Sequence, residues 1–277
     1  MKARKIESII IKSVVIVSGI ICAILVLAIV LFIMAKGVPN FNLRLFELKY
    51  NSENASMFPA IINTVIIVLM TLAIALPIGV GGAIYLVEYS DRAKNPFVRD
   101  LVKLVRITTE TLSGIPSIVF GLFGFLFFVS FLRWQFSLIA GSFTLSLMIL
   151  PTIIRTTEEA LLAVSDTYRE ASFGLGADKV RTIFKIVLPT AFSGIMNGVV
   201  LSIGRIIGET AALIYTAGTV AQIPKSVFGS GRTLAVHLYS LWCEGISTKQ
   251  AYATAVVLLC MAGLMNFISM WIEGKKK

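Results

Sequence analysis

The chain has 277 residues, of which 57% are hydrophobic and only 14% are charged. An ordinary soluble domain carries about 25% charged residues, and a soluble protein of this length has too little interior to bury so much apolar surface. The net charge of +10 would suit a nucleic-acid-binding protein, but the basic residues flank apolar runs instead of covering one face of a soluble domain. The composition therefore predicts an all-α polytopic membrane protein and excludes nucleic acid as a partner.

Six segments are apolar and long enough to cross a hydrocarbon core about 30 Å thick, which takes roughly 20 helical residues. The predicted transmembrane helices are 13–35, 61–86, 115–132, 138–154, 190–217 and 251–272. The first run is too long for the apolar part of a cleaved signal peptide, so we expect it to be retained. Pro77 and the glycines after it predict a kink in the second span, and the fourth span is expected to end near Pro151.

The distribution of Lys and Arg predicts the orientation. With the N-terminus inside, the inner segments carry 17 of these residues and the outer segments carry 7. Because inner loops of membrane proteins are enriched in Lys and Arg, both termini are expected in the cytoplasm. We divide the chain into residues 1–60, which hold the N-terminal tail, the first span and an outer loop, and residues 61–277, a five-helix core with a cytoplasmic loop at about 155–189.

Two further connecting segments are long enough to have structure of their own. In the second long outer loop, Leu234, Leu238 and Leu241 recur at helical spacing, which predicts an amphipathic helix capping the outer membrane surface, with a gating element as the alternative. His237 on this stretch has no partner ligand nearby in sequence and is expected to be structural. The inner segment 91–112 is charged and is expected to be a solvated, partly helical connection. The three cysteines lie far apart without a C-x-x-C, so neither a disulfide nor a metal site is expected.

A polar segment of 35 residues, 155–189, separates the fourth and fifth spans. Its distinctive residues are Glu170, Ala171, Ser172, Gly176, Ile186, Leu188 and Pro189. They predict a short helix, a bend that glycine permits, and a second stretch that the proline stops. A compact helix–turn–helix of this kind can dock into a groove on a partner, and an ordinary connecting loop is the alternative.

The spacing E-A-A-x3-G-x9-I-x-L-P resembles the cytoplasmic loop of the permease subunits of ABC-type importers, and the chain departs from it only at Ser172, where the family has alanine. In that family the loop is the coupling helix seated on a cytosolic ATPase. The resemblance implies that the coupling residues are Glu170, Ala171, Gly176, Ile186, Leu188 and Pro189. The chain lacks the phosphate-binding loop G-x-x-x-x-G-K-[ST], so we expect no enzyme activity and no cofactor on it, and ATP with Mg²⁺ on the partner ATPase.

The fifth span carries two charged residues, Arg205 and Glu209, four positions apart. On one helix they would touch, and their pairing would offset part of the roughly 2.5–3.5 kcal/mol that an arginine costs at the bilayer centre. One interpretation is a structural bridge between packed helices. The other is that Arg205 lines a pathway and attracts an anion. A stripe of small residues on the same helix, including Gly194 and Gly198, is expected to face protein or water.

The sequence of residues 204–210 is similar to the fifth-span signature of the membrane subunits of phosphate-specific importers, and residues 113–122 resemble their third span. Residues 230–234 and 251–255 are similar to the PstA-type family rather than the PstC-type, so the resemblance covers about the last 170 residues. It implies a MetI-like permease core and a substrate pathway formed by Arg205, Glu209 and Thr210.

The same resemblance implies a set of partners and a location. The partners are a PstC-type sister permease, a PstB-type cytosolic ATPase dimer and a PstS-type extracytoplasmic phosphate-binding protein, all at the cytoplasmic membrane of a bacterium or archaeon. The alternatives are a permease for another solute such as sulfate, molybdate or an amino acid, and an ion-coupled secondary transporter. The latter would predict inverted repeats and several intramembrane carboxylates, whereas Glu209 is the one acid inside the predicted spans.

Overall fold

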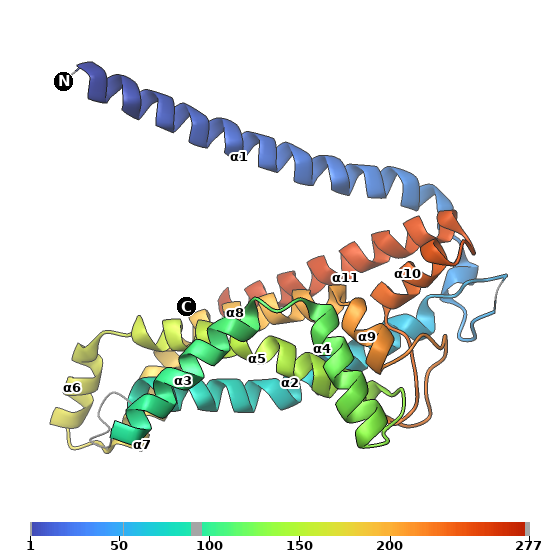
Figure 1. Ribbon diagram of the computed structural model, residues 1–277. Coiled ribbons are helices and arrows are strands. Elements are labelled where there is room, and N and C mark those ends of the chain that lie inside the picture. The colour runs from blue at the N-terminus through green and yellow to red at the C-terminus, as the bar shows by residue number, and fades with distance from the viewer. Residues whose placement is uncertain (1, 52, 90–95, 275–277) are drawn as a thin grey trace.

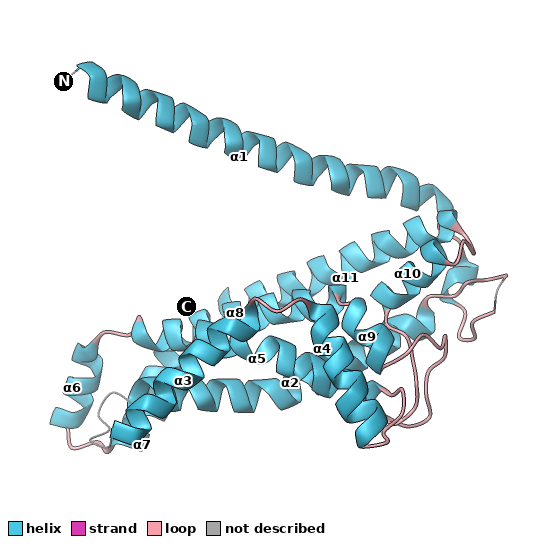
Figure 2. Ribbon diagram, viewed as in Figure 1, coloured by secondary structure: helices cyan, strands magenta, loops and turns pink. Residues whose placement is uncertain are grey.

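The computed structural model describes residues 2–51, 53–89 and 96–274, and over these ranges the chain forms helices joined by turns and loops, without strands (Figure 2). The helices are α1 (Lys2–Gly37), α2 (Phe58–Ile84), α3 (Pro96–Ser113), α4 (Ser117–Gly124), α5 (Leu138–Leu162), α6 (Asp166–Gly174), α7 (Lys179–Thr182), α8 (Leu188–Gly208), α9 (Ala211–Thr216), α10 (Leu234–Cys243) and α11 (Thr248–Gly274). Short π-helical segments continue α2 (Tyr85–Tyr89), α4 (Phe125–Phe131) and α7 (Ile183–Val187). Within the described ranges, five helices are long and apolar enough to span a membrane, and the bent pair α3–α4 is the sixth candidate span. The all-α membrane class is confirmed.

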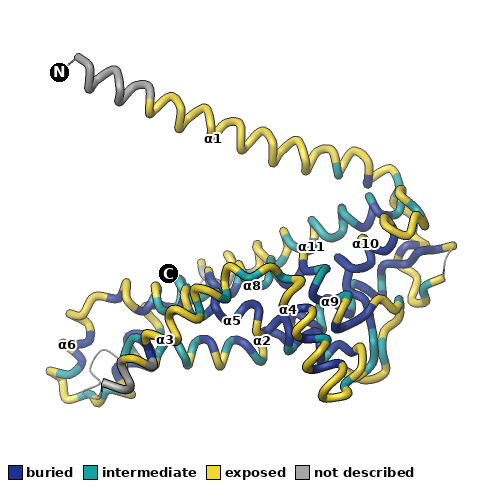
Figure 3. The backbone as a smooth tube through the Cα atoms, in the orientation of Figure 1, coloured by how far each residue is buried: buried dark blue, intermediate teal, exposed yellow. Residues whose placement is uncertain are grey.

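Helix α1 stands apart from the rest of the molecule and meets it only near its own C-terminal end (Figure 1). There Phe32 packs edge-on against Tyr252 of α11, and a Cβ on Gly37 would lie 2.5 Å from the Tyr252 carbonyl oxygen. Its described apolar side chains are otherwise almost all exposed, as the yellow tube in Figure 3 shows. So much apolar surface is stable only against lipid or another chain.

The core of the molecule is formed by α2, α5 and α8, with α5 in the middle. Small residues allow the helices to approach: a Cβ added to Gly79 of α2 would lie 2.6 Å from Ile153 Cγ2, and one added to Gly194 of α8 would lie 2.6 Å from Ala160 Cβ. Close approach at glycine is typical of helix packing in membranes, where dispersion replaces the hydrophobic effect as the main attraction. The expectation that the small-residue face of the fifth span meets protein is confirmed for Gly194.

The sequence predicted that the fourth span ends near Pro151, and this prediction is wrong. Helix α5 runs on to Leu162, with Pro151 buried inside it. The proline removes one backbone hydrogen bond, but neighbouring helices hold a membrane helix together across such a break. The polar segment between the fourth and fifth spans is therefore shorter than 155–189, because its first eight residues belong to α5.

The third span is not straight. Helices α3 and α4 meet at 106° across a break at Gly114, Ile115 and Pro116. The residue before a proline is disfavoured in the α conformation, which explains why α4 begins only after Pro116. The expected solvated connection 91–112 is largely α3, and Arg106 on it forms an ion pair with Glu158 of α5 (2.8 Å between Nη2 and Oε1). Asp91, Arg92 and Lys94 lie outside the described residues.

The amphipathic helix expected in the second outer loop is α10, and its capping of the outer membrane surface stays a prediction. It is largely buried against α11 and α2, with Leu234, Val236, His237 and Leu241 fully covered (Figure 3). Burial, with Arg232 nearby, lowers the pKa of His237 from 6.5 to about 3, so the ring is neutral at physiological pH. A neutral, enclosed histidine agrees with the expected structural role.

Helices α6 and α7, the N-terminal end of α1 and the C-terminal end of α11 all lie toward the same end of the molecule (Figure 1). This arrangement is what an even number of spans requires of the two termini. The location of that end in the cytoplasm stays a prediction from the charge distribution. The terminal residues 275–277, on which part of that prediction depends, lie outside the described residues.

Candidate functional site

The helix expected to dock on a partner is α6, and its ends are built by local hydrogen bonds. Ser165 caps its start, where the hydroxyl accepts from Thr167 N. At its end Gly176 adopts φ +83°, Ala177 N donates to Ser172 O and Gly176 N donates to Phe173 O. These two bonds form a Schellman motif, in which glycine is preferred because a left-handed φ costs it nothing. The predicted glycine bend is confirmed.

Arg169, one residue before Glu170, anchors α6 to the membrane helices, and the sequence analysis missed it. It is 8% exposed, and its Nη2 lies 2.9 Å from Glu88 Oε1 at the end of α2. The same guanidinium donates to the carbonyl oxygens of Leu161 (2.9 Å) and Val164 (2.7 Å) at the end of α5. A cation at the C-terminus of a helix satisfies carbonyls that have no partner within the helix. Arg169 thus fixes α6 to the ends of two core helices.

Two further contacts hold α7, the helix that follows α6, in position. Lys179 at the start of α7 donates from Nζ to the Glu88 carbonyl and lies 4.2 Å from the centroid of the Tyr89 ring. Ser172 Oγ and Thr182 Oγ1 are 2.8 Å apart and buried, which joins α6 to α7. The departure from the family's alanine therefore adds a hydrogen bond inside the helix–turn–helix and leaves its outer surface unchanged. The sequence signal for this anchor is Glu88, an acid directly after a long apolar run.

The outward surface of α6 carries the residues that the resemblance singled out first. Glu170 and Ala171 are exposed, and so is Gly176 at the bend; Leu175 beside it is 90% exposed. An apolar side chain this exposed at the end of a rigidly held helix is typical of a surface that another chain covers. Ile186 lines one hollow together with Leu175 and Gly176, whereas Leu188 and Pro189 lie at the start of α8.

The sequence predicted that Pro189 stops a helix, and this prediction is wrong. Pro189 lies at the start of α8, directly after the π-helical part Ile183–Val187, and the helical backbone continues through it. From Lys179 to Gly208 the chain is one continuous helical rod of 30 residues, with Ile186 in its π-helical part and Leu188 at the start of α8. The rod connects α6 directly to the opposite end of the fifth span.

The far end of this rod holds the charged pair of the sequence analysis, and the expected contact between Arg205 and Glu209 on one helix is wrong. Helix α8 ends at Gly208, and Glu209 is extended (φ −73°, ψ 125°). Its Oε1 accepts from Ala212 N (3.1 Å), so the carboxylate caps α9. Two glycines near the helix end allow this change of direction, which helical periodicity cannot foresee.

Arg205 is half-buried in the last turn of α8. Among the described residues, no acidic side chain forms an ion pair with it. One face of α8 packs on α5, whereas Asn197, Leu201, Gly204 and Gly208, at helical spacing, form an exposed stripe. Arg205 follows Gly204 at the edge of this stripe. It is a partly exposed cation of a membrane-spanning helix that no acid in the described part of the chain neutralises.

Thr210 is half-buried at the start of α9, and the structure brings this region together with the third-span motif. A Cβ added to Gly121 of α4 would lie 2.7 Å from Ala212 Cα. The third-span segment 113–122 is therefore in direct contact with the residues that directly follow 204–210, although about 90 residues separate them in sequence. Glu209 is 8% exposed, so of the three predicted pathway residues Arg205 and Thr210 are the more accessible.

A bent bundle of apolar helices, with a helix–turn–helix fixed to one end, defines a multi-pass subunit of a membrane transport system. The model of the binding-protein-dependent transport system inner membrane component matches residues 79–274. The chain belongs to this family of ABC importer permeases. The prediction made from the loop spacing is confirmed.

Relatives and solved structures agree with this assignment. The chain is 33% identical over 259 residues to the phosphate transport system permease protein PstA of Pasteurella multocida, with 88% of this chain and 87% of the relative covered. It is 30% identical over 259 residues to the probable ABC transporter permease protein YqgI of Bacillus subtilis (87% and 86% covered). In fold it is similar to a chain of the methionine ABC transporter MetNI in an inward-facing conformation (TM-score 0.60, 21% identity, 80% and 94% covered) and to one of a bacterial alginate importer (TM-score 0.59, 15% identity, 93% and 96% covered).

Proposed function

We propose that this chain is the membrane-spanning subunit of an ATP-driven importer and that its cargo is inorganic phosphate. The observation that carries the choice of cargo is Arg205 at the end of a membrane-spanning helix, a cation without an acidic partner among the described residues. It occurs in a chain that is similar over most of its length to a phosphate transport permease. An unpaired intramembrane arginine is costly and marks a substrate path by default.

The chemistry of phosphate suits this residue. Near neutral pH phosphate is negatively charged and keeps at least one O–H group. The guanidinium fork of Arg205 can donate two parallel hydrogen bonds to two of its oxygens. A single arginine provides a transient site, which passage requires, because a tight anion site in a pore would trap its cargo. High affinity then belongs to the external binding protein.

Energy reaches this site through the α6–α8 connection. The partner ATPase binds ATP with Mg²⁺ and hydrolyses the ATP, and Glu170, Ala171 and Leu175 are seated on this ATPase. Helix α6 cannot move alone, because Arg169 joins it to α2 and α5. The rod from Lys179 to Gly208 spans about 45 Å at 1.5 Å per residue. A displacement of α6 is therefore delivered to Arg205 by a stiff element and not by a flexible loop.

Glu209 is the proposed source of selectivity against sulfate. Its carboxylate can accept a hydrogen bond from the protonated oxygen of phosphate and repel fully ionised sulfate. The bond from Ala212 N occupies one lone pair of Oε1 and supports the alternative, in which Glu209 only caps α9. Substitution Glu209→Gln separates the two: a selectivity filter predicts that sulfate inhibits uptake by the variant, whereas unchanged discrimination between the anions would leave the capping role alone.

A permease for another solute is the second candidate. The family includes relatives of unassigned cargo such as YqgI, and the fold is shared with the methionine and alginate importers. The α6 surface and its anchors serve any cargo equally. The choice between solutes therefore depends on the region around Arg205 and on direct measurement of transport.

The test is uptake of radiolabelled phosphate by cells that lack their own high-affinity phosphate import. The chain is supplied with its sister permease, the ATPase dimer and the phosphate-binding protein, with and without excess sulfate. The proposal predicts sulfate-resistant uptake that disappears when this chain is omitted. If all partners are assembled in the membrane and phosphate does not enter, the cargo assignment is wrong, and the family membership is unaffected.

A further inference from the structure

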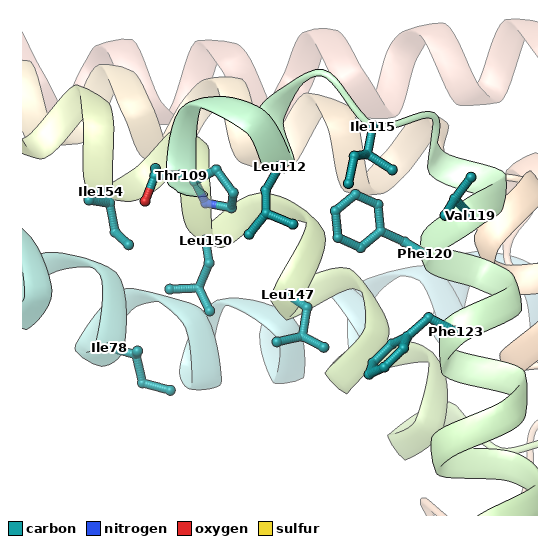
Figure 4. A pocket seen from close by; sticks show the side chains of 11 residues that line it. Ile78, Thr109, Leu112, Ile115, Val119, Phe120, Phe123, Leu147, Leu150 and Ile154 are labelled. Atoms are coloured by element: carbon teal, nitrogen blue, oxygen red, sulfur yellow. The ribbon is translucent and has the colours of Figure 1, made fainter. Parts of the chain in front are cut away.

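Two hollows of different chemistry adjoin each other where α3 bends into α4. The larger has a volume of about 520 Å³ and is lined by apolar side chains of α2, α3, α4 and α5, including Ile78, Leu112, Phe123 and Leu147 (Figure 4). We call it the apolar groove. Its volume lies in the range of about 300–1,000 Å³ that is typical of small-molecule sites. Thr109 is the one residue with a polar side chain among those that line it.

The smaller hollow, of about 210 Å³, lies beside the groove and is called the polar notch. Thr109 and Ile154 line both, so the two form one continuous depression. The notch is lined by two cations, Arg106 and Arg155, and by two anions. An amphiphile with a charged head and an apolar tail matches a charged notch that continues into an apolar groove.

The charges of the notch specify the head. Glu110 is exposed and forms no ion pair among the described residues, whereas Arg106 is held by Glu158 at 2.8 Å. Arg155 forms an exposed, weak pair with Glu159 (3.1 Å), which does not line the notch. The notch thus offers an arginine to a phosphate and a free carboxylate to an ammonium. A zwitterionic head is favoured over a purely anionic one, because Glu110 and Glu158 would repel the latter.

The position of the depression fits a lipid of the leaflet on the α6 side. Arg155 precedes the end of α5 by seven residues, and α6 follows shortly after that end. From Ile154 to Leu147 the groove follows α5 for about 10 Å toward the middle of the bundle. A head in the notch therefore has its tail pointing into the bilayer.

We propose that the notch and groove together bind one phospholipid with a zwitterionic phosphate–ammonium head, of the phosphatidylethanolamine type. Its phosphate contacts Arg155, its ammonium contacts Glu110, and one acyl chain fills the groove across the α3–α4 bend. A bound chain would cover the apolar side chains that α3, α4 and α5 present to the groove. A helix of the sister permease is the competing occupant, and it would leave Glu110 without a partner.

The test uses the complete transporter in nanodiscs that contain phosphatidylethanolamine with a photoreactive diazirine in its acyl chain, or phosphatidylglycerol with the same chain. Mass spectrometry locates the cross-linked residues. We expect labelling of groove residues on α4 and α5, roughly threefold stronger with phosphatidylethanolamine, as one additional exposed ion pair provides. Glu110→Gln should abolish this preference, and Arg155→Gln should weaken labelling by both lipids.

Leu147→Trp fills the groove and should reduce its labelling several-fold. Its matched control is Leu69→Trp, at a residue of α2 that is 62% exposed and lies on the opposite face from Ile78, and this variant should label like the parent. If Leu147→Trp prevents assembly, the Glu110 and Arg155 variants decide the question.

Two results would overturn the proposal. Cross-links from the groove to the sister permease, with no lipid, would make it a subunit interface. Groove labelling that is equal with the two lipids and unchanged in the Glu110→Gln and Arg155→Gln variants would show that the notch recognises no lipid head.

Discussion

Arg169 and Arg205 are the same side chain in two different environments. Arg169, on α6, is buried and saturated: it pairs with Glu88 and donates to the carbonyls of Leu161 and Val164. Arg205, at the other end of the helical rod, is half-buried and has no acidic partner among the described residues. The contrast teaches that charge alone does not mark a substrate site. A saturated arginine fixes structure, and an unsaturated one remains available to a ligand.

The largest effect is expected from Arg169→Ala. Removal of one partner of a buried ion pair leaves Glu88 buried and unpaired, which costs roughly 3–5 kcal/mol. We expect a lower thermal stability of the purified transporter and loss of co-purifying ATPase, measured together. Arg181→Ala, at an exposed residue of α7, is the control and should behave like the parent. Equal losses in both variants would mean that Arg169 is no anchor.

Arg205→Gln should strongly reduce phosphate uptake while leaving assembly intact, which is the opposite of the result expected for Arg169→Ala. A charged hydrogen bond contributes about 1.5–3 kcal/mol, so uptake should fall roughly 10- to 100-fold. Arg205→Lys should recover part of the rate, because lysine keeps the charge but not the fork. Uptake rates normalised to membrane content of the complex check this. Full uptake by the glutamine variant would contradict a cargo contact.

Gly176→Ala tests whether the anchored helix–turn–helix depends on its bend. A residue with a Cβ at φ +83° lowers the stability of the folded state by about 1–2 kcal/mol. We expect weaker ATPase association, readable as faster dissociation in detergent, with phosphate binding by the external protein unchanged. Gly174→Ala, a helical position with open space around it, is the matched control. If the ATPase dissociates equally fast from both variants, the left-handed bend at Gly176 is not needed to hold the outward surface of α6 in place.

Ser172→Ala should have the smallest effect. It removes the hydroxyl that bonds Thr182 but restores the residue that the family has at this position. The expected loss is about 0.5–1.5 kcal/mol, the net value of one neutral hydrogen bond, seen as a small drop in melting temperature without loss of transport. A large loss of ATPase coupling would show that the hydrogen bond between Ser172 and Thr182 is needed to transmit movement from the ATPase.

The sequence by itself determined the membrane class, the positions of the apolar spans and the family of the chain. These three properties depend on composition and on local spacing, such as the spacing from Glu170 to Gly176. Composition and local spacing can be determined from the sequence without knowledge of the fold. The sequence also singled out Arg205, because an arginine inside an apolar run is rare enough to be conspicuous.

Only the tertiary structure decided which charges meet. Helical periodicity paired Arg205 with Glu209, but α8 ends between them. The partner of Arg169 is Glu88, 81 residues away. Likewise Pro151 and Pro189, which end helices in isolation, are accommodated, the first by packing on neighbours and the second at the junction between a π-helical part and α8. Where a helix ends and which side chains it brings together depends on contacts between distant segments, and local spacing does not encode those contacts.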